Sequence, residues 1–225
     1  MRNLSDRLSL IASMVKSGSR VCDVGTDHGY LPAFLYLSGK CAEVTATDIR
    51  EKPLASAKHN IERLGATGVK LILCDGLELV TREMADTVII AGMGGEVISG
   101  IIQRCSFLRD DTVELILQPM TAAWELREYL AQNGFRVECE QAVCENNKVY
   151  SVMKVRYTGE PYVADRLFLS IGILRCDTEE SRRYIEKQKH ICEKKLSDLE
   201  AAGMKGEVYD KSTRLFNALK QILED

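Results

Sequence analysis

The chain alternates five times between a short apolar run and a segment with helical periodicity. The apolar runs are continuous rather than alternating, which is typical of parallel strands covered by helices on both faces. Two more strand-like runs follow within residues 135–157, joined by a polar turn at Glu145 to Lys148. We therefore expect an α/β fold with a doubly wound, mostly parallel sheet of seven strands and an antiparallel strand at one edge. The five leading runs occupy residues 20–25, 43–49, 69–76, 86–95 and 113–120.

Helical segments separate the strand-like runs and carry recognisable start and stop signals. A first helix begins after Ser5, which can cap it, and ends before Gly18. Gly65 and Gly134 are placed to terminate two of the later helices. These later helices are expected within residues 31–40, 51–65, 96–105 and 121–134.

After Gly159 the sequence changes character and the strand pattern ends. Apolar residues recur at three- to four-residue steps among charges, stop at residues 201–206, and resume from Leu215. This pattern predicts a helical hairpin of the coiled-coil type with one apolar stripe. We expect two domains, an α/β domain at residues 1–158 and a helical domain at residues 159–225.

Composition excludes several classes of protein. Hydrophobic residues make up 45% of the chain and charged residues 28%, and the formal net charge of −3 shows no overall basic excess. No apolar run approaches the roughly 20 residues that span a bilayer, and the N-terminus lacks the core of a signal peptide. The eight cysteines lie far apart, so we expect reduced thiols, no metal site and a cytoplasmic protein. We favour a monomer, with a weak dimer through the helical hairpin as the alternative.

Each of the five leading strands ends in glycine or polar residues. In open α/β sheets, ligands bind outside the carboxyl ends of the strands, where the strand order reverses. One polar strand end is uninformative, but five that converge on the same edge of a sheet indicate a binding site. The residues concerned are Gly25 to Gly29, Asp48, Asp75-Gly76, Gly92 to Gly95, and Gln118 to Met120.

The first of these loops is acidic. It reads Gly-x-x-x-Gly from Gly25 to Gly29, unlike the Gly-x-Gly-x-x-Gly of dinucleotide-binding folds, and Asp23 precedes it. The carboxylates of Asp23 and Asp27 would repel a pyrophosphate but attract a cationic ligand. S-adenosylmethionine carries a sulfonium and an ammonium beside a ribose, whose hydroxyls Asp48 is placed to bind. The sequence therefore favours S-adenosylmethionine over NAD as cofactor.

Each of these residues also has a structural interpretation that the sequence leaves open. Asp23 can cap the end of a strand, and Asp48 can cap the helix that follows Ile49. His28 can bond to the backbone at a helix start, and residues 92–95 can pack a helix against a strand. The functional interpretation depends on all of these residues occurring together.

Four motifs in chain order resemble the bacterial tRNA (adenine-N1)-methyltransferases that modify the adenine at position 22 in the D-arm. They are LSDRLSLIASMV at residues 4–15, DVGTDHGYLP at 23–32, IIAGMGG at 89–95 and LILQPM at 115–120. The resemblance covers roughly residues 1–158 and continues more loosely into the helical segment, which that family also has. Family members often have asparagine at the position of Met120. The resemblance implies a Rossmann-like, S-adenosylmethionine-dependent methyltransferase that acts on tRNA.

The resemblance also implies roles for individual residues. The expected cofactor-binding residues are Asp23, Gly25, Thr26, His28 and Gly29 around the methionine part, Asp48 and Ile49 at the ribose and adenine, Asp75 and Gly76 at the adenine edge, and Gly92, Met93 and Gly94 between cofactor and target base. The resemblance also places Gln118, Pro119 and Met120 near the target base, by analogy with the Asn-Pro-Pro-Tyr loops of other adenine methyltransferases. Two more substrate residues are expected from the sequence itself. These are Arg7, as a basic residue, and Tyr30, which follows the acidic loop and can either stack on the base or pack in the core.

The chemistry of methyl transfer to adenine N1 points to one catalytic candidate. N1 has a lone pair and needs no base before attack, so much of the rate should come from positioning. Methylation makes the base cationic, and a carboxylate near the exocyclic amine would stabilise that charge and accept the released proton. Asp27 is the candidate and His28 the runner-up. The sequence leaves open whether Asp27 is instead a second anchor for the cofactor.

The target base lies within folded tRNA, so it must be unstacked to reach the pocket. Binding folded RNA would use its shape and its phosphates. Basic residues that could make such contacts, or equally form solvated helix faces, are Arg2, Arg7, Lys16 and Arg20 near the N-terminus, and Arg182, Arg183, Lys187 and Lys189 in the helical segment.

Three functions stay under consideration on the sequence alone. The first is S-adenosylmethionine-dependent methylation of adenine N1 in the tRNA D-arm. The second is methylation of another RNA position or of a small molecule. The third is a non-catalytic module that binds tRNA or the cofactor, against which the intact acidic strand ends at Asp23 and Asp48 argue.

Overall fold

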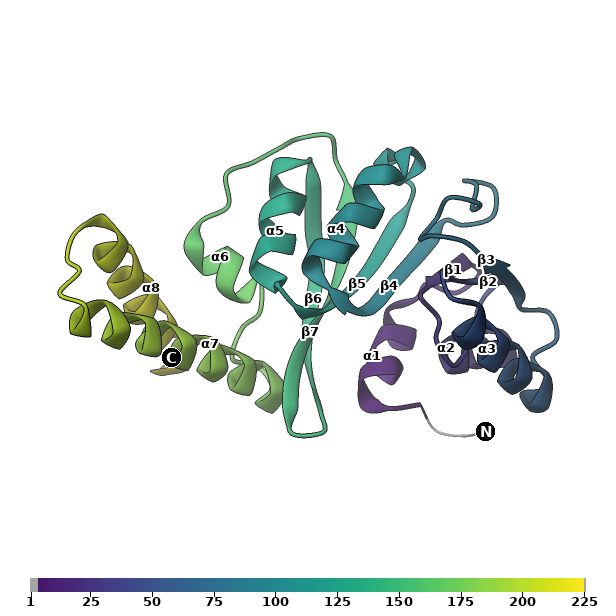
Figure 1. The fold of residues 1–225 in the computed structure, drawn as a ribbon, viewed down its shortest axis with the longest axis horizontal. Helices are drawn as coiled ribbons and strands as arrows, with labels where there is room; N and C mark the ends of the chain where they lie inside the picture. The colour runs from purple at the N-terminus through teal and green to yellow at the C-terminus, as the bar shows by residue number, and fades with distance from the viewer. Residues whose placement is uncertain (1–3, 225) are drawn as a thin grey trace.

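The computed structural model describes residues 4–224 and is built around one seven-stranded sheet (Figure 1). The strand order is β3-β2-β1-β4-β5-β7-β6. Strands β1 to β5 pair in parallel, and β7 runs antiparallel to both β5 and the edge strand β6. This confirms the predicted fold class. The strands are β1 (Arg20–Val24), β2 (Glu43–Asp48), β3 (Lys70–Leu73), β4 (Thr87–Gly94), β5 (Glu114–Thr121), β6 (Phe135–Glu145) and β7 (Lys148–Tyr157).

Helices cover the sheet on both faces. One face packs against α4 and α5 and buries Val88 and Ile90 of β4, whereas the other packs against α1, α2 and α3 and buries Ile89. Successive residues of β4 point to opposite faces, so this strand needs an unbroken apolar sequence. The helices are α1 (Asp6–Met14), α2 (Tyr30–Leu37), α3 (Glu51–Leu64), α4 (Gly95–Arg104), α5 (Ala123–Gln132), α6 (Arg166–Ile171), α7 (Glu179–Ala201) and α8 (Glu207–Glu224), with a 3-10 turn η1 (Ser106–Arg109).

The strand order reverses beside β1. The chain proceeds from β1 through β2 to β3 at one edge, then returns to place β4 on the other side of β1. The helices that follow β1 and β4 therefore diverge and leave a crevice at the carboxyl ends of these two strands. Such a switch point is the usual ligand site of an open α/β sheet.

A two-residue turn joins β6 to β7. Asn146 and Asn147 both have positive φ angles, of 49° and 60°. Two successive left-handed residues give a hairpin turn whose twist matches that of the strands, and asparagine tolerates this conformation better than most residues. The polar turn expected at this place is thus explained by its backbone geometry.

The C-terminal helices form the predicted hairpin. Helices α7 and α8 pack against each other around Cys192, Leu215 and Leu219, and the break lies at residues 202–206. The N-terminal part of α7 packs on β6 and β7, where Tyr184 and Ile185 are buried (Figure 1). Within residues 4–224, no helix has both the length and the apolar character that a membrane span requires.

A fully buried arginine links the C-terminal helices to the sheet. Arg127 of α5 donates from Nη2 to Glu140 Oε1 of β6 at 2.6 Å and to the Tyr184 hydroxyl of α7 at 3.3 Å. Its Nη1 donates to the backbone oxygens of Leu169 and Ser170 in α6. Because one guanidinium holds four elements together, the relative placement of α5, β6, α6 and α7 depends on it.

We expect that replacing Arg127 with methionine will lower the free energy of unfolding by about 3–5 kcal/mol, because it removes the cation that pairs with the buried Glu140 carboxylate and leaves that carboxylate, within residues 4–224, only the backbone N–H of Ile173. Urea denaturation followed by circular dichroism measures this loss. The matched control is Lys70→Met, which breaks the exposed ion pair with Glu43 and should leave the midpoint nearly unchanged. Equal midpoints for the two variants would contradict the structural role given to Arg127.

Candidate active site

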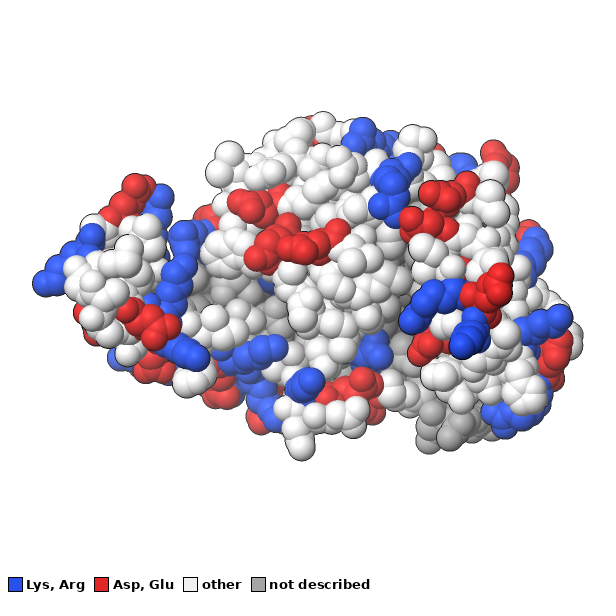
Figure 2. Space-filling model, in the orientation of Figure 1, with Lys and Arg blue, Asp and Glu red and all other residues white. Residues whose placement is uncertain are grey.

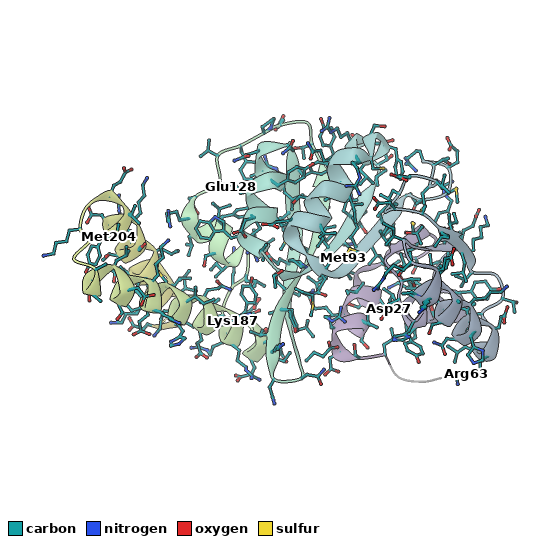
Figure 3. All side chains as sticks on the ribbon, in the orientation of Figure 1. Asp27, Arg63, Met93, Glu128, Lys187 and Met204 are labelled. Atoms are coloured by element: carbon teal, nitrogen blue, oxygen red, sulfur yellow. The ribbon has the colours of Figure 1, made fainter. Side chains whose placement is uncertain are left out.

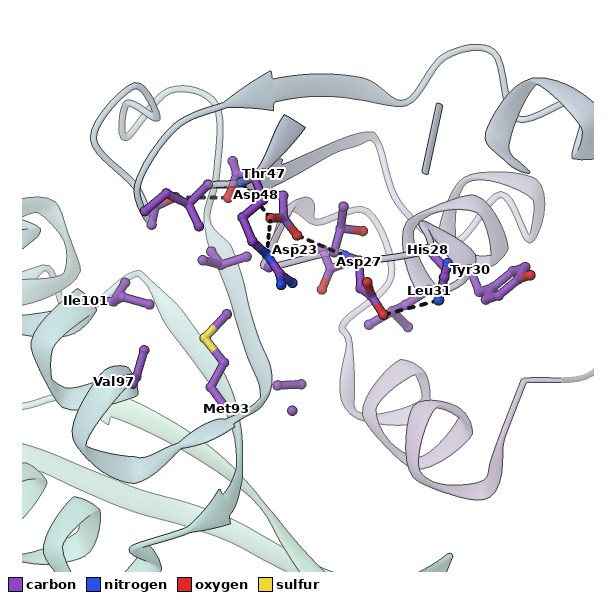
Figure 4. Close-up of a pocket in the computed structure, with 18 of the residues that line it drawn as sticks. Asp23, Asp27, His28, Tyr30, Leu31, Thr47, Asp48, Met93, Val97 and Ile101 are labelled. Carbon is purple, nitrogen blue, oxygen red and sulfur yellow. Dashed lines mark hydrogen bonds and ion pairs between the residues drawn. The ribbon is translucent and has the colours of Figure 1, made fainter. Parts of the chain in front are cut away.

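A cavity of about 580 Å³ lies at the switch point, outside the carboxyl ends of β1, β2 and β4 (Figure 4). Its size is that of a typical cofactor site. The structure brings together here most of the residues that the sequence singled out. These are Arg7, Asp23, Gly25, Thr26, Asp27, His28, Tyr30, Asp48, Ile49, Asp75, Gly76, Gly92 and Met93.

The other five predicted site residues lie outside the lining of this cavity. Gly29 is the N-cap residue of α2 with φ of +70°, and a Cβ there would lie 3.0 Å from the side chain of Ala57, so the glycine lets α2 pack closely against α3. Gly94 ends β4. Gln118 and Pro119 are buried within β5, and Met120 is exposed at the end of that strand.

Eight residues line the cavity that the sequence analysis did not single out. Val97 and Ile101 of α4 form an apolar wall, and Val97 is exposed, which is unusual for an apolar residue in the first turn of a covered helix. This exposure cannot be seen in the sequence, where both residues fit the apolar face of α4. The full set is Leu8, Val24, Leu31, Thr47, Arg50, Ala91, Val97 and Ile101.

Asp23 is the buried carboxylate of the site. It is the penultimate residue of β1 and is 5% exposed, and no lysine or arginine of residues 4–224 forms an ion pair with it. Burial raises the pKa of Asp23 to about 6, the nearby Thr26 hydroxyl lowers it in part, and the charge of Asp48 raises it further. A buried carboxylate that lacks a cation in the described chain is suited to bind a cationic ligand group.

Asp48 holds the two loops on either side of the cavity. Its Oδ2 accepts a hydrogen bond from the backbone N–H of Asp27 at 3.2 Å, and its Oδ1 accepts one from Arg50 at 2.9 Å. Asp48 therefore contacts the backbone just before α3, but it does not cap the helix, whose N-cap residue is Arg50 and which has no side-chain cap; Asp48 also lines the cavity. Its carboxylate can bind ligand hydroxyls with the lone pairs that remain.

Asp27 is an exposed carboxylate beside Asp48 and close to His28. The side chain of Asp27 is 60% exposed, and its Oδ2 lies 3.5 Å from His28 Nε2, while His28 Nδ1 lies 3.1 Å from the Ser56 hydroxyl. Asp27 has a φ of +52°, an uncommon conformation for a residue with a side chain. Because this side chain is exposed, the turn places a carboxylate at the mouth of the cavity rather than in its floor.

Two glycines of the site have left-handed backbone conformations. Gly25 has φ of +72°, and a Cβ there would lie 2.1 Å from the Met93 methyl carbon, so Met93 lies directly over the Gly25 turn. Gly92 has φ of +77° and precedes Met93. Figures 3 and 4 show Met93 reaching into the cavity from the end of β4, toward the loop that carries Asp27.

Asp75 is another carboxylate that lines the cavity, and it is more exposed than Asp23 and Asp48. The Asp75 carboxylate is 42% exposed and accepts an ion-pair contact from Arg104 Nη2 at 3.1 Å. The backbone oxygen of Gly76 accepts a hydrogen bond from the Thr47 hydroxyl at 2.9 Å, which ties this loop to the end of β2. Asp75 would therefore share its charge between Arg104 and any ligand.

Most of the candidate RNA-binding residues lie away from the cavity. Arg20 pairs with Asp86, and Lys187 of α7 donates to the backbone oxygen of Val149 at 3.3 Å. Figure 3 shows Lys187 well removed from Asp27. Arg7 alone of this group lines the cavity within the described chain, and Arg2 lies outside the described residues.

Comparison with known proteins gives concordant matches. Residues 4–153 match a family model described as a methyltransferase domain. The chain is 33% identical over 172 residues to a tRNA (adenine(22)-N(1))-methyltransferase of Bacillus subtilis, covering 76% of this chain and 72% of that protein.

Solved structures match over nearly the whole chain. The crystal structure of the B. subtilis m1A22 tRNA methyltransferase has a TM-score of 0.83 at 25% identity, covering 99% of this chain and 100% of that one. A Streptococcus pneumoniae protein in complex with S-adenosyl-L-methionine has a TM-score of 0.79 at 29% identity, covering 98% and 100%. The similarity therefore extends through the C-terminal helices.

Proposed function

The chain belongs to the family of the tRNA (adenine(22)-N1)-methyltransferases, and we propose that it transfers a methyl group from S-adenosylmethionine to N1 of the adenine at position 22 in the tRNA D-arm. The observation that carries this proposal is the acidic cavity at the switch point. Its buried carboxylate, Asp23, lacks a cationic partner within residues 4–224 and suits the ammonium of the cofactor. The same acidity would oppose a pyrophosphate.

The cavity residues fit the parts of the cofactor in order along the sheet. Asp23 and the Gly25 turn would hold the methionine part, and Asp48 would accept hydrogen bonds from the ribose hydroxyls. Ile49, which is 61% exposed, offers an apolar surface to the adenine, with Asp75 at its edge. The cofactor supplies a methyl group on a sulfonium, which is transferred by in-line displacement.

The chain itself positions the base and stabilises its charge. The Asp27 carboxylate, at the mouth of the cavity, would lie beside the exocyclic amine of the adenine, stabilise the cation formed at N1, and accept the released proton. Tyr30, the first residue of α2, follows this loop and would stack on the base. Gly92 and Met93 would form the opposite side, where the turn lets backbone approach the base closely.

The tRNA would contact the protein through several small basic areas. Figure 2 shows lysine and arginine interspersed with aspartate and glutamate on the face that it presents, including the C-terminal helices.

We propose that residues 159–225 form a helical domain beside the catalytic domain at residues 1–158, that the protein acts as a monomer, and that it acts in the cytoplasm. Met120, exposed at the end of β5, would lie near the target, with Gln118 and Pro119 shaping the strand end behind it.

The direct test is mass spectrometry of unmodified tRNA incubated with the protein and S-adenosylmethionine. We expect 1-methyladenosine in the fragment that contains position 22 and in no other. Methylation at a different position would favour the second function considered from the sequence. Calorimetry that finds no binding of S-adenosylmethionine would exclude both enzymatic functions.

We expect cofactor affinity to depend on pH through Asp23. Because the pKa of Asp23 is about 6 in the free protein, the carboxylate that binds the ammonium is replaced by the neutral acid as the pH falls. The dissociation constant should be flat above pH 7 and should rise by up to tenfold per pH unit below about pH 6. Calorimetry from pH 5 to 8 measures this. Asp23→Asn should bind weakly with no such pH dependence, and a wild-type profile that is flat down to pH 5 would contradict the role of Asp23.

A further inference from the structure

Arg7 is held by two residues that lie far from it in the sequence. Its Nε donates to Glu145 Oε2 at 3.1 Å, and its Nη1 donates to Gln118 Oε1 at 2.8 Å. Glu145 ends β6 at the hairpin turn, and α1 lies beside this hairpin (Figure 1). The guanidinium therefore ties α1 to the ends of β5 and β6. An arginine whose donors are engaged in this way is not a free surface charge.

Gln118 transmits this restraint to the cavity wall. It is 0% exposed, and its Oε1 also accepts a hydrogen bond from the backbone N–H of Gly92 at 3.1 Å. Its Nε2 donates to the backbone oxygen of Pro119 at 2.9 Å. Both ends of the amide are thus used within the protein, and Gln118 fixes the left-handed Gly92 turn that places Met93 over Gly25.

Arg7 also borders the cavity. The Arg7 side chain is 18% exposed and lines the cavity together with Asp27 and Gly92. A guanidinium has five N–H donors, and only those on Nε and Nη1 are engaged by side chains within residues 4–224. The remaining donors can meet acceptor atoms of a bound nucleotide.

Glu145 balances the charge of Arg7. Burial raises the pKa of Glu145, but Ser5 and Arg7 together lower it by more, so that its pKa lies below the usual value and it stays a carboxylate. The pair is neutral beside a base that becomes cationic when it is methylated. An arginine without this partner would oppose that charge.

Resting on the proposed function, we propose that Arg7 is a positioning residue for the target adenine, held by Glu145 and Gln118 so that its free donors orient the nucleotide while Gln118 holds the Gly92 turn against it. This differs from the expectation that Arg7 contributes a phosphate contact as one of several basic residues. A lysine could supply the charge of Arg7 but could not bridge two acceptors and still face the cavity.

The test is Arg7→Lys, assayed with saturating S-adenosylmethionine and unmodified tRNA. Misplacement of the base should lower kcat at least tenfold and change KM for tRNA by less than threefold. The dissociation constant of the cofactor, measured by calorimetry, should stay within twofold of wild type. The matched control is Arg156→Lys, which alters a 2.8 Å pair with Glu138 on the same hairpin and should leave kcat unchanged.

Two further measurements separate positioning from a merely structural role. Amide hydrogen exchange at Gly92 should become faster in Arg7→Lys, because Gln118 loses the partner that orients it. Glu145→Gln keeps the shape and an acceptor for Nε but removes the negative charge, so it should lower kcat by about threefold to tenfold with unchanged affinity for the cofactor.

Each opposite outcome overturns a specific statement. If Arg7→Lys retains kcat and Arg7→Ala only raises KM with a weaker salt dependence, Arg7 is a phosphate contact. If Arg7→Lys lowers kcat, cofactor affinity and melting temperature together, its role is structural. If the wild-type protein makes no 1-methyladenosine, the proposed function fails. Unchanged exchange at Gly92 in Arg7→Lys would still refute the Arg7–Gln118–Gly92 connection.

Discussion

Replacing Asp27 with asparagine should lower kcat about 100-fold while the dissociation constant of S-adenosylmethionine stays within threefold of wild type. The carboxylate would no longer stabilise the cationic base or accept its proton, and a positioned acid–base group typically contributes about 10²–10⁴-fold. Asparagine is the informative substitution because it tolerates the φ of +52° at this position, whereas alanine would add backbone strain. Single-turnover kinetics with preformed enzyme–tRNA complex measures the chemical step.

The opposite pattern has an equally clear meaning. If Asp27→Asn weakens cofactor binding tenfold or more and leaves kcat at saturating cofactor unchanged, Asp27 is a second anchor for the cofactor. His28→Gln serves as the companion variant, because His28 Nε2 lies 3.5 Å from the Asp27 carboxylate. We expect its effect on kcat to be smaller than that of Asp27→Asn. A larger effect would make His28 the group that accepts the proton.

The second large effect is expected at Asp48. Asp48→Asn should weaken S-adenosylmethionine binding about 100-fold, equivalent to about 3 kcal/mol, because hydrogen bonds to a charged group contribute about 1.5–3 kcal/mol each. Asp48 now accepts hydrogen bonds from the backbone N–H groups of Asp27 and Arg50. In the asparagine variant, the side-chain NH₂ group would face one of these two donors and could not accept its hydrogen bond. Isothermal titration calorimetry with S-adenosylmethionine and with S-adenosylhomocysteine measures the loss for both ligands.

Asp75→Asn is the matched control in the same cavity. Its carboxylate is 42% exposed and shared with Arg104, so water and the arginine already weaken its interaction with a ligand. We expect less than a tenfold loss of cofactor affinity. If Asp48→Asn and Asp75→Asn lost cofactor affinity equally, burial of a carboxylate would not decide how much it contributes to cofactor binding. That result would contradict the geometry of the site.

Much of the site was predictable because it depends on local sequence at strand ends. Asp23, Asp48 and Asp75 each follow a continuous apolar run, and parallel strands bring their carboxyl ends to one edge whatever the loops do. Gly25 and Gly92 were predictable for a similar reason, since tight turns at positive φ favour glycine. The cavity wall from α4 was not predictable, because Val97 and Ile101 read as ordinary core positions.

Long-range hydrogen bonds could not be predicted from one sequence. In the sequence Arg127 is an ordinary charged position on a helix, yet it is fully buried and bonds to a partner 57 residues later in the chain, Tyr184. Arg7 reads as one of several basic residues, and only the fold brings Glu145 and Gln118 to it. Such pairings depend on the docking of whole elements.

The sequence by itself determined the α/β class, the order of strands and helices, the helical hairpin and the acidic strand ends, because periodicity, turn residues and strand termini are local properties of the chain. Tertiary structure alone decided which acids are buried and which are exposed. It placed Asp23 in the floor of the cavity and Asp27 at its mouth, although the two are four residues apart. Burial and hydrogen-bond partners come from neighbouring elements, and these two properties govern the charge, the pKa and the expected role of each carboxylate.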